Sequence, residues 1–167
     1  MIKIRSSVTI QRPVEVVFDW VNNPERHTHW QLELLEVAHY PAERKLVEVR
    51  RLLGRRIEHV MEIVEHEENR RIRHRGGADT HSIDRLYTFE DSYGSTLLTI
   101  EVDMTSEGVF AMAAPTLERM MKRQIDGSLQ HLKDILEAHP ELDDMAQQLP
   151  LHDPPGKPKT PPAEHKA

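Results

Sequence analysis

Residues 95–138 read STLLTIEVDMTSEGVFAMAAPTLERMMKRQIDGSLQHLKDILEA, and this stretch decides the fold. From Leu98 to Met104 apolar and polar residues alternate, which is typical of a half-buried strand. After Gly108 the apolar residues recur at steps of three and four, which predicts one long amphipathic helix over residues 109–138. The sequence therefore predicts a strand followed directly by a long helix.

The two-residue period also dominates the sequence before this stretch. Ile2 to Ile10 alternates, and strand-like segments separated by turn residues run from residue 32 to residue 105. Between them, apolar residues at helical spacing are interrupted at Asn22-Asn23-Pro24, which predicts two short helices. One strand, two short helices, about six antiparallel strands and one long helix make an α+β domain with about seven strands. Such a sheet buries its apolar face by curling around the long helix.

Glycines punctuate the predicted strands at two places. Gly76-Gly77 follows the basic segment Arg70 to Arg75 and is expected to interrupt that strand, because glycine weakens strand interiors. Tyr93-Gly94 lies between two alternating segments and predicts a hairpin turn.

The chain is long enough for one domain with a single hydrophobic core, at 167 residues. Most of its 11 prolines lie beyond residue 139, and the last 15 residues read DPPGKPKTPPAEHKA. We predict a folded domain over residues 1–139 and a Pro-rich, disordered tail over residues 140–167.

Charge and composition exclude several classes of protein. A net charge of -6 argues against electrostatic nucleic-acid binding, which needs clustered Lys and Arg. The pairs Arg50-Arg51, Arg55-Arg56 and Arg70-Arg71 have acids around them, so we interpret them as outward-facing strand positions. Without cysteine the chain has no disulfide, thiolate nucleophile or thiolate metal ligand, which fits a reducing cytoplasm. The N-terminus has no long apolar run, so we expect a cytoplasmic protein without membrane insertion.

The first candidate for chemistry is the pair His27 and His29, followed by Trp30. On a helix, side chains two residues apart point about 200° away from each other, so the two imidazoles cannot share a metal ion. No His-Glu-x-x-His pattern accompanies them. We therefore predict two exposed histidines and no metal site, with Trp30 as an anchor that packs the short helices onto the sheet.

The second candidate is the set His59, His74 and His81 on successive strand segments. His59 stands between Ile57 and Met61 on the apolar face, so its side chain is expected to point inward. A buried histidine satisfied by a hydrogen bond is the favoured interpretation, ahead of ligand contact or acid–base chemistry and of metal binding. A run of acids on alternating strand positions of the same region is interpreted as a solvated face, without chemistry: Glu58, Glu62, Glu65, Glu67 and Glu68.

Four stretches carry a family resemblance: RPVEVVFDWVNNPERHTHW (12–30), GRRIEHVMEIVEHEE (54–68), YTFEDSYGSTLLTIEVDM (87–104) and LQHLKDILEA (129–138). With their order and spacing, residues 2–138 resemble the START-like (SRPBCC) superfamily, and within it the polyketide cyclase/dehydrase and lipid-transport branch. The resemblance implies a helix-grip fold, in which a curved antiparallel sheet wraps around the C-terminal helix. It also implies a cavity between sheet and helix that binds a hydrophobic or aromatic small molecule, with no metal or organic cofactor.

We expect the ligand-binding residues of such a cavity to include His59, Met61, His74, Tyr87, Phe89, Met104, Phe110, Leu117 and Met121. The leading hypothesis is a binding or carrier protein for a lipid or polyketide-like molecule. The alternative is a cofactor-independent cyclase or dehydratase, with His59 or Tyr87 as the candidate catalytic residue. A further alternative is a protein-interaction module that uses the acidic surface and the tail. The sequence leaves open the ligand and the oligomeric state, a homodimer included.

Overall fold

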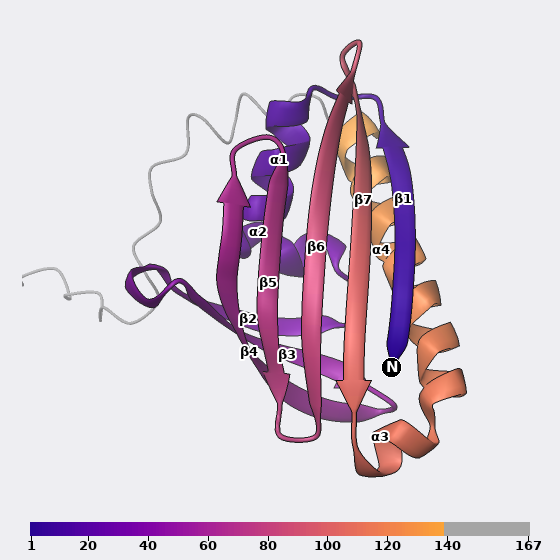
Figure 1. The fold of residues 1–167 in the computed structure, drawn as a ribbon. Coiled ribbons are helices and arrows are strands. Elements are labelled where there is room, and N and C mark those ends of the chain that lie inside the picture. Colours follow the sequence, from indigo (N-terminus) through magenta and orange to yellow (C-terminus); the bar gives the residue numbers. More distant parts are fainter. Residues whose placement is uncertain (139–167) are drawn as a thin grey trace, which may run out of the picture.

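The computed structural model describes residues 1–138, so the predicted tail at 140–167 lies outside the described residues. Seven antiparallel strands form one sheet in the order β1-β7-β6-β5-β4-β3-β2, and helices flank it (Figure 1). The predicted α+β, helix-grip arrangement is confirmed. The strands are β1 (Ile2–Ile10), β2 (Leu34–Tyr40), β3 (Lys45–Leu52), β4 (Arg55–Glu67), β5 (Arg71–Ala78), β6 (His81–Ser92) and β7 (Ser95–Ser106). The helices are α1 (Val14–Asn22), α2 (Pro24–Trp30), the 3-10 turn η1 (Pro41–Glu43), α3 (Gly108–Met112) and α4 (Ala114–Ala138).

The sheet is strongly curved around α4. Figure 1 shows β2 and β3 running nearly crosswise to β6 and β7, with α4 beside β7 and β1. Helix α4 packs against β1, where Lys133 Nζ donates a hydrogen bond of 2.7 Å to the carbonyl oxygen of Thr9. The apolar stripe of α4 is buried as its spacing predicts, at Leu117, Met121, Leu129, Leu132 and Leu136.

The predicted single helix over 109–138 is broken into α3 and α4. Ala113 separates them with φ -91° and ψ 9°. Pro115 explains the break, because its missing N–H cannot bond to the Ala111 carbonyl and its ring would collide with that carbonyl in a continuous helix. Neither α4 nor any other helix within residues 1–138 has the length and apolar character needed to span a membrane.

The two short helices are separated at the predicted break, Asn22-Asn23-Pro24. Asn23 caps α2 through its Oδ1, which accepts a hydrogen bond of 3.1 Å from the Glu25 N–H. Trp30 is fully buried, as expected of an anchor. The prediction of two exposed histidines is wrong for His27, which is buried with Nε2 2.6 Å from the Val21 carbonyl oxygen. His27 shares a helix face with Trp30 at a spacing of three, so the docking that buries Trp30 also buries His27, while His29 faces solvent.

The glycine pair in β5 does not interrupt the strand, contrary to the prediction. Strand β5 continues through Gly76 and Gly77 to Ala78. A Cβ at Gly76 would overlap the Val60 carbonyl oxygen, and one at Gly77 would overlap the His81 carbonyl oxygen. The pair therefore lets the backbones of β4 and β6 come closer to β5 than any side chain would allow. The predicted turn at Tyr93-Gly94 is confirmed, with positive φ at both residues.

Gly76→Ala is expected to lower the free energy of unfolding by about 1–3 kcal/mol, because the new methyl group meets backbone that cannot move aside independently. Urea denaturation followed by circular dichroism measures the loss. Gly94→Asn is the control: no atom lies within 4 Å of a Cβ there, and asparagine tolerates the positive φ. Equal stability of the Gly76→Ala variant and the parent would contradict close approach at this position.

Candidate functional site

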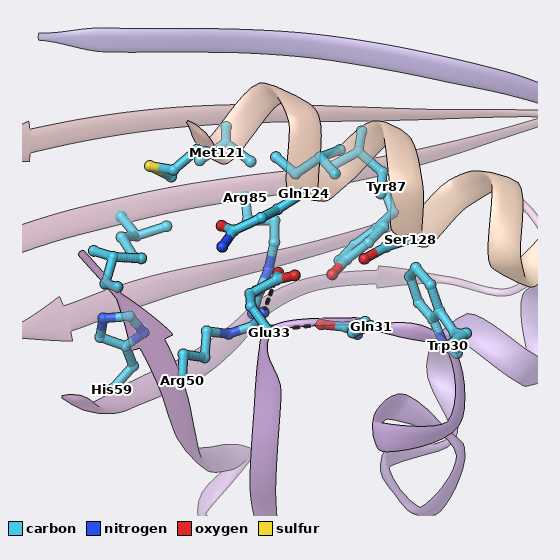
Figure 2. A pocket seen from close by; sticks show the side chains of 15 residues that line it. Trp30, Gln31, Glu33, Arg50, His59, Arg85, Tyr87, Met121, Gln124 and Ser128 are labelled. Atoms are coloured by element: carbon cyan, nitrogen blue, oxygen red, sulfur yellow. Dashed lines mark hydrogen bonds and ion pairs between the residues drawn. The ribbon is translucent and has the colours of Figure 1, made fainter. Parts of the chain in front are cut away.

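A cavity lies between α4 and the concave face of the sheet (Figure 2). One part of its wall is apolar, formed by Trp30, Leu52, Ile83, Ile100, Val102, Met121 and Ile125. The other part is polar, formed by Gln31, Glu33, Arg50, His59, Arg85, Tyr87, Gln124 and Ser128. The lining residues come from α2 and the segment after it, from β3, β4, β6 and β7, and from α4, so the curl of the sheet creates the cavity.

The cavity is small. Its volume is about 60 Å³. Pockets that hold drug-sized ligands typically have about 300–1,000 Å³, so this cavity has room for a small ligand only. A single aromatic ring is of this size. A larger ligand requires side chains of α4, such as Met121 and Gln124, to move.

Arg50 is at the centre of a buried ionic network. Its Nε donates to Glu48 over 2.8 Å, one terminal nitrogen donates to Glu33 over 3.0 Å, and the other donates to Gln31 over 2.6 Å. The interpretation of Arg50 as outward-facing is wrong, since only 7% of its side chain is exposed. Its partner in sequence, Arg51, does face solvent, as do Arg55, Arg56 and Arg70, while Arg71 is half-buried.

Glu48 joins Arg50 to Arg85. Arg85 donates to the second carboxylate oxygen of Glu48 over 2.7 Å. Burial opposes the ionisation of Glu48, but Arg50 and Arg85 outweigh it and hold the pKa of this carboxyl well below its ordinary value. A buried carboxylate between two guanidinium groups is thus ionised at neutral pH. Within residues 1–138, Arg85 Nε and the other Glu33 carboxylate oxygen, Oε2, are buried without a hydrogen-bond partner.

Two buried histidines meet at one end of the cavity. His59 lines the cavity, and its Nε2 lies 2.6 Å from Nε2 of His81. Burial, followed by the charge of Arg50, lowers the pKa of His59 to about 3, and burial also lowers the pKa of His81. Both imidazoles are therefore neutral at pH 7.

Tyr87 stands on the polar side of the cavity. Figure 2 shows its hydroxyl and the amide of Gln124 turned toward the same space as the Glu33 carboxylate. Burial raises the pKa of Tyr87, so its hydroxyl stays protonated near neutral pH and can act as a hydrogen-bond donor. His74 packs edge-on against the Tyr87 ring, with 5.7 Å between ring centroids.

Three of the nine predicted ligand-binding residues line the cavity: His59, Tyr87 and Met121. The other six are buried in the core around it: Met61, His74, Phe89, Met104, Phe110 and Leu117. Phe89 packs on Phe18 and Phe110 packs on His81, with centroids 5.1 and 5.3 Å apart. The acids of β4 are exposed as interpreted, except that Glu65 is half-buried beside Arg71 and Arg73.

The ionic network was not predicted from the sequence, although a signal for it exists. Glu48 and Arg50 are in phase with Leu46 and Leu52 on β3, so alternation places all four side chains inside. Arg85 likewise stands between the inward-facing Ile83 and Tyr87 on β6. A charged residue in phase with buried apolar neighbours indicates a functional or paired charge. Ser128, to which the sequence assigned no role, lies in the cavity wall and accepts a hydrogen bond of 3.0 Å from the Leu32 N–H.

This arrangement suits binding of an amphipathic small molecule. No group of three or more His, Asp or Glu side chains within residues 1–138 is placed to hold a metal ion. The cavity instead offers an apolar surface for a hydrophobic body, with a guanidinium donor, a carboxylate acceptor and a tyrosine hydroxyl for polar atoms.

Comparison with known proteins agrees with the geometry. Residues 1–137 match the family model described as polyketide cyclase/dehydrase and lipid transport. A Thermus thermophilus protein of known structure shares 16% identity at a TM-score of 0.70, covering 81% of this chain and 97% of its own. A START superfamily protein from Mycobacterium smegmatis shares 19% identity at a TM-score of 0.62, covering 85% of this chain and 99% of its own. At such identities the structural likeness supports the fold alone. No curated protein matches the sequence significantly.

Glu48→Gln is expected to lower the free energy of unfolding by about 3–5 kcal/mol, because Arg50 and Arg85 lose the charge that compensates them inside the protein. Chemical denaturation at pH 7 measures the loss. Glu36→Gln is the control, since the Glu36–Arg56 pair is exposed and such pairs contribute no more than about 1 kcal/mol. A loss of less than about 1 kcal/mol in the Glu48 variant would contradict a buried ionised network.

Stability is expected to fall as the pH drops below 6.5. Burial lowers the pKa of His27 to about 4, so between pH 6.5 and 4 the unfolded chain binds a proton there that the folded chain does not. Each such histidine reduces the free energy of unfolding by about 1.4 kcal/mol per pH unit in this window.

His27→Gln should therefore reduce the slope of unfolding free energy against pH by about 1.4 kcal/mol per pH unit, which corresponds to one proton. Urea titrations at pH 7, 6 and 5 give the slope. His29→Gln is the matched control on the same helix, because the His29 side chain is exposed when folded. An unchanged slope in the His27 variant would mean that His27 takes up its proton in the folded state as well.

Proposed function

Since the chain belongs to the polyketide cyclase/dehydrase and lipid transport family, we propose that it binds a small hydrophobic or aromatic molecule in the cavity between the sheet and α4. The observation that carries this proposal is the divided wall, apolar on one part and charged on the other. Two polar atoms of residues in that wall, Arg85 Nε and Glu33 Oε2, are buried without a partner in residues 1–138. An unpaired buried polar atom costs about 1–3 kcal/mol, which a ligand with matching groups recovers.

The ligand class follows from these atoms. Arg85 Nε donates, so it suits a carbonyl or carboxylate oxygen, and Glu33 Oε2 accepts, so it suits a hydroxyl. The size of the cavity fits about one ring. A single aromatic ring with a hydroxyl and a carbonyl or carboxylate satisfies both groups. Burying about 150 Å² of such a ring contributes about 4 kcal/mol, and a hydrogen bond to the guanidinium contributes about 1.5–3 kcal/mol.

A cofactor-independent cyclase or dehydratase is the second candidate function, with His59 and Tyr87 as the proposed catalytic residues. One observation favours it: His59 lines the cavity and is neutral, so one of its nitrogens keeps a lone pair for a substrate proton. Tyr87, protonated, would donate to a developing oxyanion. Arg85 would stabilise the same negative charge.

Binding is tested with 4-hydroxybenzoate, salicylate and 2-hydroxyacetophenone by isothermal calorimetry. The parent is expected to bind at least one of them, and Ile125→Trp, which fills the cavity, is expected to weaken that binding at least tenfold. Gln130→Trp places the same side chain on the exposed face of α4 and should leave the affinity unchanged. Arg85→Met should weaken binding by roughly 10–100-fold, the equivalent of a lost hydrogen bond to a charged group.

Absence of binding for every probe, or equal binding by the Ile125 variant, would overturn the proposal. Native mass spectrometry of the freshly purified protein gives a second measurement. A small molecule should remain bound to the parent and to Gln130→Trp, but not to Ile125→Trp. A further assay distinguishes an enzyme from a carrier protein. The protein is incubated with a poly-β-ketone thioester, and ring closure is followed by NMR. An enzyme loses turnover but keeps binding in His59→Ala or Tyr87→Phe, whereas a carrier changes only its affinity.

A further inference from the structure

His59 and His81 approach each other across an intervening strand. His59 is on β4 and His81 on β6, and β5 lies between them. Ala78 pairs directly with His81, and the register that places Val60 opposite Gly77 brings His59 level with Ala78. The small Ala78 side chain leaves room for both imidazoles above it, and the neighbouring glycines draw the three strands together.

The two rings form a hydrogen-bonded chain with Thr80. The His59 and His81 rings meet edge to face at 89°, with Nε2 of one 2.6 Å from Nε2 of the other. His81 Nδ1 lies 3.0 Å from Oγ1 of Thr80. Phe110 packs edge-on against the His81 ring, with 5.3 Å between ring centroids. Thr80 and its neighbour Asp79 are exposed in the turn between β5 and β6, so the chain reaches from the cavity to the surface.

A neutral imidazole carries one N–H and one lone pair, which couples the two rings. One Nε2 must donate and the other accept. When His59 donates from Nε2, its Nδ1 is a lone pair and His81 donates from Nδ1 to Thr80. When His81 donates from Nε2, it accepts at Nδ1 from the Thr80 hydroxyl, and His59 carries its proton on Nδ1. The tautomers of His59 and His81 are therefore opposite in both states.

The inner end of this chain faces the cavity without a partner. His59 Nδ1 is buried and makes no hydrogen bond within residues 1–138. Figure 2 shows one nitrogen of the His59 ring turned toward the other cavity side chains and the second turned away from them. Since Nε2 is bound to His81, which does not line the cavity, Nδ1 is the nitrogen left without a partner, and a ligand reaches it when the side chains that cover it move.

We propose that His59, His81 and Thr80 form a tautomer-coupled proton relay, in which His59 Nδ1 accepts from a ligand hydroxyl in one state and donates to a ligand oxygen in the other. The proposal rests on the proposed function, because the cavity ligand supplies that group. The hydroxyl proton passes to His59 Nδ1, the His59 Nε2 proton passes to His81 Nε2, and the His81 Nδ1 proton passes to Thr80 Oγ1. Thr80 releases its own proton to water. The ligand becomes an oxyanion and the three protein groups stay neutral.

The charges around the relay favour this neutral transfer. Arg50 and Arg85 both disfavour an imidazolium at His59, and Glu48 only partly offsets them. The same guanidinium groups favour the ligand oxyanion that the transfer leaves in the cavity. A positive charge therefore does not collect on the histidines while the proton moves outward.

The resting state is tested first, in the full chain without added ligand. Long-range ¹H–¹⁵N correlation spectra of ¹⁵N-histidine protein identify the protonated nitrogen of each ring. The expected result is opposite tautomers for His59 and His81. His81→Phe keeps the ring packing against Phe110 but removes the nitrogen, and it should shift the His59 tautomer populations. The same tautomer in both rings, or an imidazolium at His59 at pH 7, would overturn the relay whatever the cavity binds.

The ligand arm uses phenol, which can donate, and acetophenone, which can only accept. Phenol should populate the state in which His59 Nδ1 is unprotonated and His81 carries its proton on Nδ1. Acetophenone should populate the state in which His59 Nδ1 is protonated and His81 carries its proton on Nε2. In His81→Phe the ratio of the two affinities should change about tenfold, which a packing role alone would not produce. His29→Gln, remote and exposed, should change neither tautomers nor ratio. Binding of both probes without a tautomer response overturns the relay alone, whereas failure of every probe to bind overturns the proposed function.

Discussion

The ion pair between Glu48 and Arg85 constrains the whole structure. Glu48 is on β3 and Arg85 on β6, three strand spacings apart in the sheet, which is about 14 Å when a sheet is flat. Their side chains nevertheless meet at 2.7 Å. The concave curl of the sheet brings the two side chains together, and the glycine pair at 76 and 77 assists this by removing the side chains that would hold β4, β5 and β6 apart. The curl encloses the cavity, brings His59 to His81 and gives α4 a concave surface to cover.

Desolvation limits what the ionic network adds to stability. A buried carboxylate between two guanidinium groups gains strong Coulomb attraction, but desolvation of the three charges offsets much of that gain. An apolar core of the same volume would hold the strands together equally well. What the charges add is a fixed geometry: Glu48 orients both arginines, Gln31 and Glu33 complete the shell of Arg50, and one edge of Arg85 stays unpaired. The network therefore positions a donor at the cavity wall that an apolar core could not supply.

The sequence predicts the scaffold well, because the scaffold depends on local periodicity. Alternation locates the strands, the spacing of three and four locates α4, and Asn22-Asn23-Pro24 separates the short helices. The site depends on which side chains meet across several strands, and periodicity gives only the face that each side chain occupies. Periodicity places His59 inside but does not pair it with His81, and the acids around Arg50-Arg51 suggest an outward position that is wrong for Arg50. The glycine pair was interpreted as an interruption, since its role appears only when the neighbouring backbones are in place.

The chemistry of the cavity also bears on the two activities that the family description joins. An acyl chain would place methylene groups against Arg85 Nε and Glu33 Oε2, so it would not recover the cost of about 1–3 kcal/mol that each unpaired atom already carries. A long chain would also exceed a cavity of about 60 Å³, so α4 would have to move away from the sheet. A hydroxylated aromatic ring would avoid both disadvantages, because its oxygens would pair with the polar atoms and its faces would lie against Ile100, Val102 and Met121. The balance of size and polarity therefore favours an oxygenated, ring-sized molecule over a long-chain lipid.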